Sequence, residues 1–408
     1  MSLFGALFTG VSALGSQSQS MAMISNNIAN VNTVGYKKVF ADFSSLVTSS
    51  TGAYAPGGVQ AVRTATTASQ GVLQQTANPT DIAVSGNGFF VVRREPNAAQ
   101  EVLYTRAGSF REDNTGYLRN TANMVLYGWP VDADGNIPDT NANLSSLEPV
   151  NVSFLGGQTK PTTSATLALN LNASQSTTAT APHFTRDITV YDSLGSAQAL
   201  TLEFNRTGTN AWTLTVLDGA TTLQAATAVT FNTDGSLNQI GGNSVTELTI
   251  NNINWGNGSD TSQDIVLDLA NITQYDADYN VVSISQNGAE LGLRTGVQVD
   301  RYGAVYATFS NGTTAQLYQL PIATFANPNG LAEQSGNAFS VTTNSGDYNL
   351  REPGASGAGL VAPSSLEGSN VDLADEFSKM IVTQRAYSAS TKVITTADQM
   401  MEELLRTR

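Results

Sequence analysis

The sequence predicts an α+β fold, mainly β, in which long amino- and carboxy-terminal helices pair as a coiled-coil-like layer and β-sandwich or barrel domains lie between them. Three observations support this. Apolar residues recur at alternating three- and four-residue steps near both ends, which is the spacing of a coiled-coil helix. Residues 80 to 360 carry strand and turn signals throughout, and the sequence shows no third helical pattern between the ends.

The amino-terminal helix is predicted to present one apolar face, interrupted by Ser18 and Ser25. Gly5, Gly10 and Gly15 weaken an isolated helix by about 1 kcal/mol each relative to alanine, but they let another backbone come close. Such a helix needs neighbours to be stable, so we assign its apolar face to self-assembly. The face consists of Phe4, Leu7, Val11, Leu14, Met21 and Ile28.

The carboxy-terminal helix keeps the same spacing for about 33 residues, which is roughly 50 Å of helix. Ser369 and Asp372 resemble a capping box, and Asp375 and Glu376 suit the positive end of the helix dipole. Two helices of one intramolecular bundle would show similar stripes, and that alternative stays open. The self-assembly face predicted here is Leu373, Phe377, Met380, Tyr387, Ile394, Met401 and Leu405, with Gln384, Thr391 and Asp398 as polar interruptions.

The interior of the chain reads as short strands joined by turns. The alternating residues of the clearest strands are Leu200, Leu202 and Phe204, then Trp212, Leu214 and Val216, then Val229 and Phe231. The turn sequence NTDG follows at 232 to 235. The Thr/Ser/Ala-rich stretch 157 to 182 is expected to be a linker or domain junction.

These signals divide the chain into four parts. The terminal helical domain is 1–32 with 370–408, the connector is 33–77 and 352–369, the first β domain is 78–145 with 285–351, and the second, outer β domain is 146–284.

Asparagines crowd the end of the amino-terminal helix, in SNNIANVNTVGYKK at 25 to 38. Asparagine tolerates the left-handed conformation and bonds to local backbone, so a cluster of asparagines ends a helix and turns the chain. Four suggest a specifically shaped connector, although a loose loop would also fit the pattern. The predicted connector residues are Asn26, Asn27, Asn30, Asn32, Gly35 and Tyr36.

Composition argues against several classes of partner. Lys+Arg 19 against Asp+Glu 33 gives a formal net charge of -14, which disfavours nucleic acid and anionic membranes. The first 36 residues contain no charged side chain, so the basic region of a secretory signal is missing. No run approaches the roughly 20 apolar residues of a membrane span, and we expect no membrane insertion.

The sequence offers no catalytic, cofactor or metal site. Cysteine is absent and His183 is the one histidine, so nucleophile systems and zinc sites lack residues. The acidic run from Asp132 through Asp134 and Asn136 to Asp139 has glycine at its fourth place and not its sixth, which predicts a turn rather than a calcium loop. We therefore expect a protein that is not an enzyme and has no cofactor.

Several long segments resemble one family. SALGSQSQSMAMISNNIANVNTVGYKK (12 to 38) and EGSNVDLADEFSKMIVTQRAYSASTKVITTADQMMEELLR (367 to 406) resemble the two terminal signatures of bacterial flagellar rod and hook axial proteins. Between them, NPTDIAVSGNGFFVV (78 to 92), YTRAGSF (104 to 110), GYLRN (116 to 120) and YGAVYATFSNGTTAQLYQLPIATFANPNGL (302 to 331) are similar to the body of the same family. Length favours the hook type, because the rod proteins are considerably shorter and lack most of the β-rich insert.

The resemblance implies a structural subunit of the bacterial flagellum, exported unfolded through the type III export apparatus. Identical subunits would polymerise into a hollow, curved, flexible tube outside the cell, a universal joint that transmits torque from rod to filament in swimming. The implied partners are sister subunits and the rod, hook cap and hook–filament junction proteins. The terminal helices would order on assembly. Two alternatives remain: the distal rod protein of the basal body and a secreted β-rich adhesin.

Overall fold

The computed structural model describes residues 3–47, 56–97, 101–132, 135–137, 143–153 and 156–406. The chain divides into two compact units. Unit 1 comprises Met1–Phe154, Val297–Ala307 and Ala315–Arg408, and unit 2 comprises Leu155–Gly296 and Thr308–Thr314. The predicted fold class is confirmed, because the structure is mainly β with the two terminal helices packed together.

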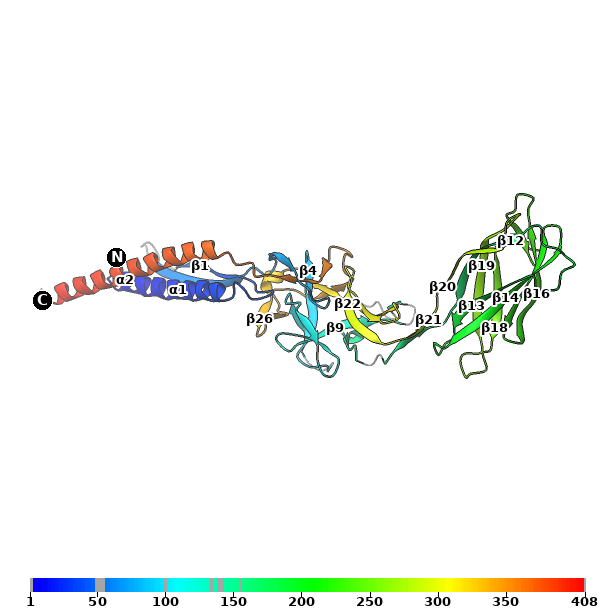
Figure 1. Ribbon diagram of the computed structural model, residues 1–408. Helices are drawn as coiled ribbons and strands as arrows, with labels where there is room; N and C mark the ends of the chain where they lie inside the picture. The colour runs from blue at the N-terminus through cyan, green and yellow to red at the C-terminus, as the bar shows by residue number, and fades with distance from the viewer. Residues whose placement is uncertain are drawn as a thin grey trace. The chain divides into compact units, whose positions relative to one another are not determined.

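The terminal helices form one layer of unit 1. Helix α1 (Leu3–Ala29) and helix α2 (Leu373–Arg406) lie side by side (Figure 1). The Asp372 carboxylate accepts the N–H groups of Ala374 at 2.8 Å and Asp375 at 3.2 Å, so α2 begins with an aspartate cap. The predicted capping box therefore places the cap three residues too early, since the Ser369 hydroxyl accepts only the N–H of Val371.

A β-hairpin packs along α1 in the same layer. Strands β1 (Val39–Val47) and β2 (Pro56–Ala65) pair antiparallel and both contact α1. The prediction of a connector over 33–77 missed this hairpin. Two serines of α1 help to hold it, because Ser16 Oγ donates to the Val59 carbonyl and Ser12 Oγ accepts the Val59 N–H. We call α1, β1, β2 and α2 the helical layer.

The rest of unit 1 is the first β domain, built from many short strands. Its main sheet runs β22-β23-β24-β9-β5-β6-β27-β26. Two apolar clusters fill it, one around Phe90 and Val305 and one around Phe89 and Phe339, whose rings meet edge to face at 5.6 Å. Three of the four boundaries between the two units fall within β22 (Arg294–Val299), β23 (Ala304–Phe309) and β24 (Thr314–Gln319).

The remaining elements of this domain are β3 (Leu73–Gln75), β4 (Ile82–Ser85), β5 (Phe90–Arg93), β6 (Leu103–Thr105), β7 (Phe110–Glu112), β8 (Leu118–Asn120), β9 (Val125–Pro130), β10 (Glu148–Pro149), β25 (Ile322–Thr324), β26 (Ala332–Gln334), β27 (Ala338–Ser340), β28 (Asn349–Arg351), β29 (Leu360–Pro363) and β30 (Ser365–Glu367), with the 3₁₀ turns η1 (Leu144–Ser146) and η2 (Pro328–Gly330). Strands β29 and β30 pair with β4 and β3, so the segment that precedes α2 is attached to this domain.

Unit 2 is a β-sandwich. One sheet runs β18-β19-β12-β20 and the other β13-β14-β15-β16-β17. Side chains from both sheets form a single apolar core, and burial alternates along β12 in one sheet and β15 in the other. Its strands are β11 (Gln158–Lys160), β12 (Ser164–Asn172), β13 (Phe184–Tyr191), β14 (Ala197–Gly208), β15 (Ala211–Asp218), β16 (Thr221–Phe231), β17 (Leu237–Ile240), β18 (Glu247–Ile253), β19 (Gln263–Tyr275), β20 (Asn280–Gln286) and β21 (Ala289–Gly292).

The strand predictions for unit 2 hold where apolar residues alternate. All eight residues named for 200 to 231 are buried in β14, β15 and β16, and Gly235 closes the predicted turn with its N–H bonded to the Asn232 carbonyl. The prediction of a linker at 157–182 is wrong, because β12 lies inside the β18-β19-β12-β20 sheet between β19 and β20. Its alternating leucines Leu167, Leu169 and Leu171 are buried, and the residues between them, Ala168 and Asn170, are half-buried.

Candidate assembly site and its junction

The structure leaves every residue of the two predicted assembly faces at least partly accessible. Phe4, Val11, Leu373, Phe377, Tyr387 and Leu405 are exposed, and Leu7, Leu14, Met21, Ile28, Met380, Ile394 and Met401 are half-buried. An exposed apolar stripe on a helix usually marks a surface that another protein covers. Their role in self-assembly stays a prediction, since a single chain does not contain the contact.

Other residues of the two helices make most of the contacts within the chain, although Ile394 of the predicted assembly face takes part. Gly10 packs so closely that a Cβ there would lie 2.9 Å from Cγ1 of Ile394. Gly15, by contrast, has nothing within 4 Å of the same position. The other buried residues of α1 are Ser16, Ser20, Ile24 and Asn27, and those of α2 are Glu376, Thr383 and Ala397. Most of these residues are small or polar, so apolar spacing does not reveal them. Gly10, Asn27 and Glu376 stand out in the sequence for other reasons. Ser16 and Ser20 could have been found as two small residues four positions apart.

Asn27 is the centre of the predicted connector. Its side chain is 1% exposed, and its Nδ2 donates to the Val39 carbonyl at 2.7 Å and to Glu376 Oε2 at 2.8 Å. Its Oδ1 accepts the Val39 N–H and the Tyr36 hydroxyl, both at 3.0 Å. Burial and the nearby Glu333 carboxylate raise the pKa of Tyr36 to about 12, so this hydroxyl keeps its proton to donate. One amide thus joins the end of α1, the start of β1 and the first turn of α2.

The other connector residues shape the backbone. Asn30 Nδ2 donates to the Asn26 carbonyl at 2.9 Å, and Asn26 Nδ2 donates to the Tyr36 hydroxyl at 3.2 Å. Gly35 has φ +69°, and a Cβ there would lie 2.6 Å from the Ala107 nitrogen, so a side chain does not fit. Asn32 is exposed. The contacts favour the shaped connector over the loose loop.

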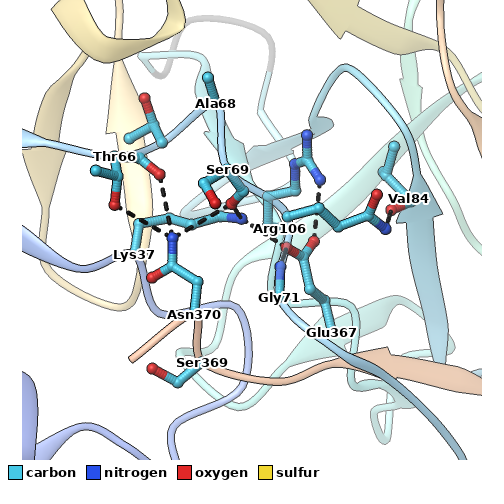
Figure 2. A network of polar contacts seen from close by, with 12 residues as sticks. Lys37, Thr66, Ala68, Ser69, Gly71, Val84, Arg106, Glu367, Ser369 and Asn370 are labelled. Atoms are coloured by element: carbon cyan, nitrogen blue, oxygen red, sulfur yellow. Dashed lines mark hydrogen bonds and ion pairs between the residues drawn. The ribbon is translucent and has the colours of Figure 1, made fainter. Parts of the chain in front are cut away.

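A buried ionic cluster lies immediately beyond this connector (Figure 2). Glu367 receives Lys37 Nζ on Oε1 at 2.5 Å and Arg106 Nη1 on Oε2 at 3.1 Å, and none of the three side chains is more than 2% exposed. The Gly71 N–H adds a third bond to Oε1 at 2.8 Å. Burial lowers the pKa of Lys37, and the Glu367 carboxylate opposes that shift.

The same cluster ties together chain segments that are far apart in sequence. Lys37 Nζ also donates to the Ser69 carbonyl at 2.6 Å. Asn370 accepts the Lys38 N–H on Oδ1 at 2.7 Å and donates through Nδ2 to the Thr66 carbonyl at 3.2 Å (Figure 2). We call Lys37, Arg106, Glu367 and Asn370 the junction cluster. It lies where the chain leaves β2 for the first β domain and where it returns from β30 to α2, so it joins the helical layer to that domain.

The part of the chain that the structure describes holds no group of three or more residues that could bind a metal ion. His183 accepts the Arg206 N–H on Nδ1 at 2.9 Å and meets the Trp212 ring edge to face, which is a structural role. The Asp132 carboxylate accepts the Asn136 N–H, as the turn prediction requires; Asp134 and Asp139 lie outside the described residues. Within the same residues, neither helix is long and apolar enough to span a membrane.

Comparison with known proteins assigns the chain. Four family models match it: "Flagella basal body rod protein" at 7–37, "Flagellar hook protein FlgE/F/G D1 domain" at 83–153, "Flagellar basal body protein FlaE D2 domain" at 158–289 and "Flagellar basal body rod FlgEFG protein C-terminal" at 362–407. The chain is 32% identical to the flagellar hook protein FlgE of Caulobacter vibrioides and 34% identical to that of Brucella suis, with 99% of both chains covered in each case. The chain belongs to the flagellar hook protein FlgE family.

The FlgE protein of Escherichia coli is also similar, at 30% identity over 99% of this chain and 100% of its own. Membership confirms the resemblance at both termini and extends it to the middle, where the D2 model covers most of the insert that no motif had matched. The chain is therefore a structural hook subunit, not an enzyme, and forms part of a polymer in the extracellular part of the flagellum.

Proposed function

We propose that copies of this chain polymerise into a hollow, curved, flexible tube that acts as a universal joint and transmits torque from the flagellar rod to the filament in swimming. The observation that carries the proposal is the pairing of two features in unit 1. Apolar side chains project from both helices of the helical layer, and a buried junction cluster joins that layer to the first β domain.

The exposed stripes supply the contacts between subunits. Phe377 and Tyr387 of α2 and Phe4 of α1 are each at least 45% exposed in the single chain. Covering such side chains stabilises the assembly by about 25 cal/mol for each Å² of apolar surface removed from water. Helices packed in this way form the inner layer of the tube, and the chain has no cysteine, so the contacts are noncovalent.

The junction cluster transmits twist to the outer part of the subunit. A buried carboxylate that binds a lysine, an arginine and a backbone N–H is fixed by more than one bond, and losing any partner leaves an uncompensated charge. Rotation of the helical layer is therefore passed to the first β domain. Charged residues make up only 13% of the chain, which suits polar interfaces that re-form as a tube bends.

The partners at the two ends of the tube follow from the same proposal. They are the rod below, the hook cap during growth and the hook–filament junction proteins above. The chain reaches them through the type III export apparatus, unfolded, and its helical layer completes its packing on assembly.

Electron microscopy of polymers grown from the purified chain tests the proposal. We expect hollow tubes that curve, and no tubes from a variant that lacks residues 1–30. Straight, rigid shafts would support a distal rod protein instead. Normal tubes without the amino-terminal helix, or glycan binding by the chain with no polymer, would contradict the proposal and favour the adhesin alternative.

A further inference from the structure

An apolar groove opens in the helical layer at the end nearest the junction cluster. It has a volume of about 370 Å³, and residues of α1, β1 and α2 line it. Ile24 of α1 and Val39 of β1 lie at its base, being 6% and 2% exposed. Phe43 of β1 and Val382 of α2 form its walls and are 48% and 67% exposed. A groove with exposed apolar walls suits apolar side chains of a partner.

The charged groups at the groove are already paired. Lys379 Nζ bonds Asp375 Oδ2 at 2.7 Å, and this carboxylate raises the pKa of Lys379. Glu376 is 1% exposed, accepts a hydrogen bond from the Asn27 amide and forms an ion pair with Lys379. The groove therefore offers no unpaired charge to a partner, and a partner that brings a charge would leave it without a counterion.

The same layer carries an uncharged apolar ridge near the other end of α1. Phe4, Phe8 and Val11 lie on one helical face at spacings of four and three residues, and they are 72%, 59% and 60% exposed. Phe8 was not part of the predicted assembly face. Helix α1 has no charged side chain along its whole length. The exposed apolar residues near the end of α2 are flanked by Glu402, Glu403 and Arg406, so they suit the groove less well.

One chain cannot join its own ridge to its own groove. Phe8 and Ile24 are 16 residues apart on a continuous helix, which is about 24 Å at 1.5 Å per residue. A ridge and a groove at different places on the same molecule make a heterologous contact, and a heterologous contact that does not close produces a helical filament.

We propose that the groove lined by Ile24, Val39, Phe43 and Val382 receives the Phe4–Phe8–Val11 ridge of a second copy of this chain. The contact is head to tail and repeats from subunit to subunit. It rests on the proposed function, since it specifies which surfaces meet in the polymer.

Cross-linking in the polymer tests the contact directly, because the chain has no cysteine of its own. One population carries Phe8→Cys and a second, isotope-labelled population carries Val382→Cys; both are assembled with an excess of unmodified chain and treated with a short bis-maleimide. Val282→Cys is the matched control, because Val282 is 72% exposed in unit 2. We expect mixed-label dimers from F8C with V382C and none above background from F8C with V282C. Tubes that yield equal amounts from both pairs, or none from F8C with V382C, overturn the contact while leaving the proposed function intact.

A second measurement does not depend on the cross-linker. Val382→Asp places an unpaired charge in the groove and should raise the critical concentration for tube formation at least about tenfold. Val282→Asp should change it less than about twofold. Equal shifts for the two variants would contradict the proposed contact. If the unmodified chain forms no tube at all, the proposed function itself fails.

Discussion

The sandwich of unit 2 and the helical layer of unit 1 bury very different side chains. Unit 2 closes one apolar core with aliphatic and aromatic residues from both of its sheets, among them Trp212 and Phe204. The helical layer buries mainly small and polar residues, such as Ser20 and Thr383, and leaves its largest apolar side chains outside. One region therefore buries its large apolar side chains within a single chain, whereas the other leaves them accessible.

Hydrogen exchange on the dilute monomer gives the sharpest test of this comparison. Amides in β14 and β15 should be protected by the full stability of the sandwich, whereas amides in α2 should open locally at little cost. We expect protection factors to differ at least about a thousandfold, which corresponds to about 4 kcal/mol. Equal protection in the two regions would break the comparison, and restored protection of α2 in the polymer would sharpen it.

Removing a core side chain should lower the stability of unit 2 even in the unassembled monomer. Trp212 is 1% exposed, stacks with Phe184 and donates from Nε1 to Gln274 Oε1 at 2.9 Å. W212A should lower the free energy of unfolding of unit 2 by about 3 to 5 kcal/mol in denaturant titration. The control V282A, at an exposed position, should stay within about 0.5 kcal/mol.

Within unit 1, we expect stability to be most sensitive to a small change of a side chain in the junction cluster. Glu367→Gln keeps the shape of the side chain but leaves Lys37 and Arg106 buried without their anion. We expect a loss of about 3 kcal/mol in the stability of unit 1, measured by denaturant unfolding. Asp375→Asn also breaks ion pairs, but these are partly exposed and should cost at most about 1 kcal/mol. Equal losses would mean that the junction is no stronger than a surface pair.

Acid should weaken unit 2 through Asp192. Burial acts to raise the pKa of Asp192, but hydrogen bonds from Asn257, Gln198 and the N–H groups of Ser196 and Leu194 outweigh it and hold the pKa below its ordinary value. The stabilisation is thus present above the ordinary aspartate pKa of about 3.9 and is lost as pH falls through the lower folded value. The free energy of unfolding of unit 2, measured from pH 6 to pH 2, should show this loss. In D192N this free energy should depend less on pH over the same range.

The smallest expected effect comes from two glycines of α1. Gly15→Ala meets nothing within 4 Å in the single chain and should stabilise the isolated helical layer by up to about 1 kcal/mol. Gly10→Ala should gain less, because its Cβ would press on Ile394. Thermal melts of the monomer measure both. If G15A also hinders tube formation, a neighbouring subunit approaches that face.

The sequence predicted those elements whose side chains follow a simple period. Leu200 to Phe204 and Trp212 to Val216 alternate, and Phe377 and Met380 follow the helical spacing, so strands and helices could be assigned there. The sequence did not predict the β1–β2 hairpin or β12. Serine, threonine, alanine and glycine lie between their apolar positions, and these residues are typical of loops as well as of strands that face a close neighbour.

The junction cluster could not be found from local patterns at all. Lys37 and Glu367 are 330 positions apart, and neither lies in a motif that announces an ion pair. Asn27 shows the intermediate case. The asparagine cluster indicated a shaped connector, but only the fold reveals that one amide of the four meets Glu376 of the other helix. Chain topology, not spacing, decides which polar residues share a buried site.

Asn370 links the two backbone segments that connect the helical layer to the first β domain. The backbone crosses between the helical layer and the first β domain on the way out, at 66–71, and on the way back, at 367–372, and the Asn370 amide bridges the two crossings through the Thr66 and Ser69 carbonyls. The two backbone segments therefore connect the helical layer to the first β domain in parallel. Under the proposed function, a force applied to one crossing would be taken up partly by the other.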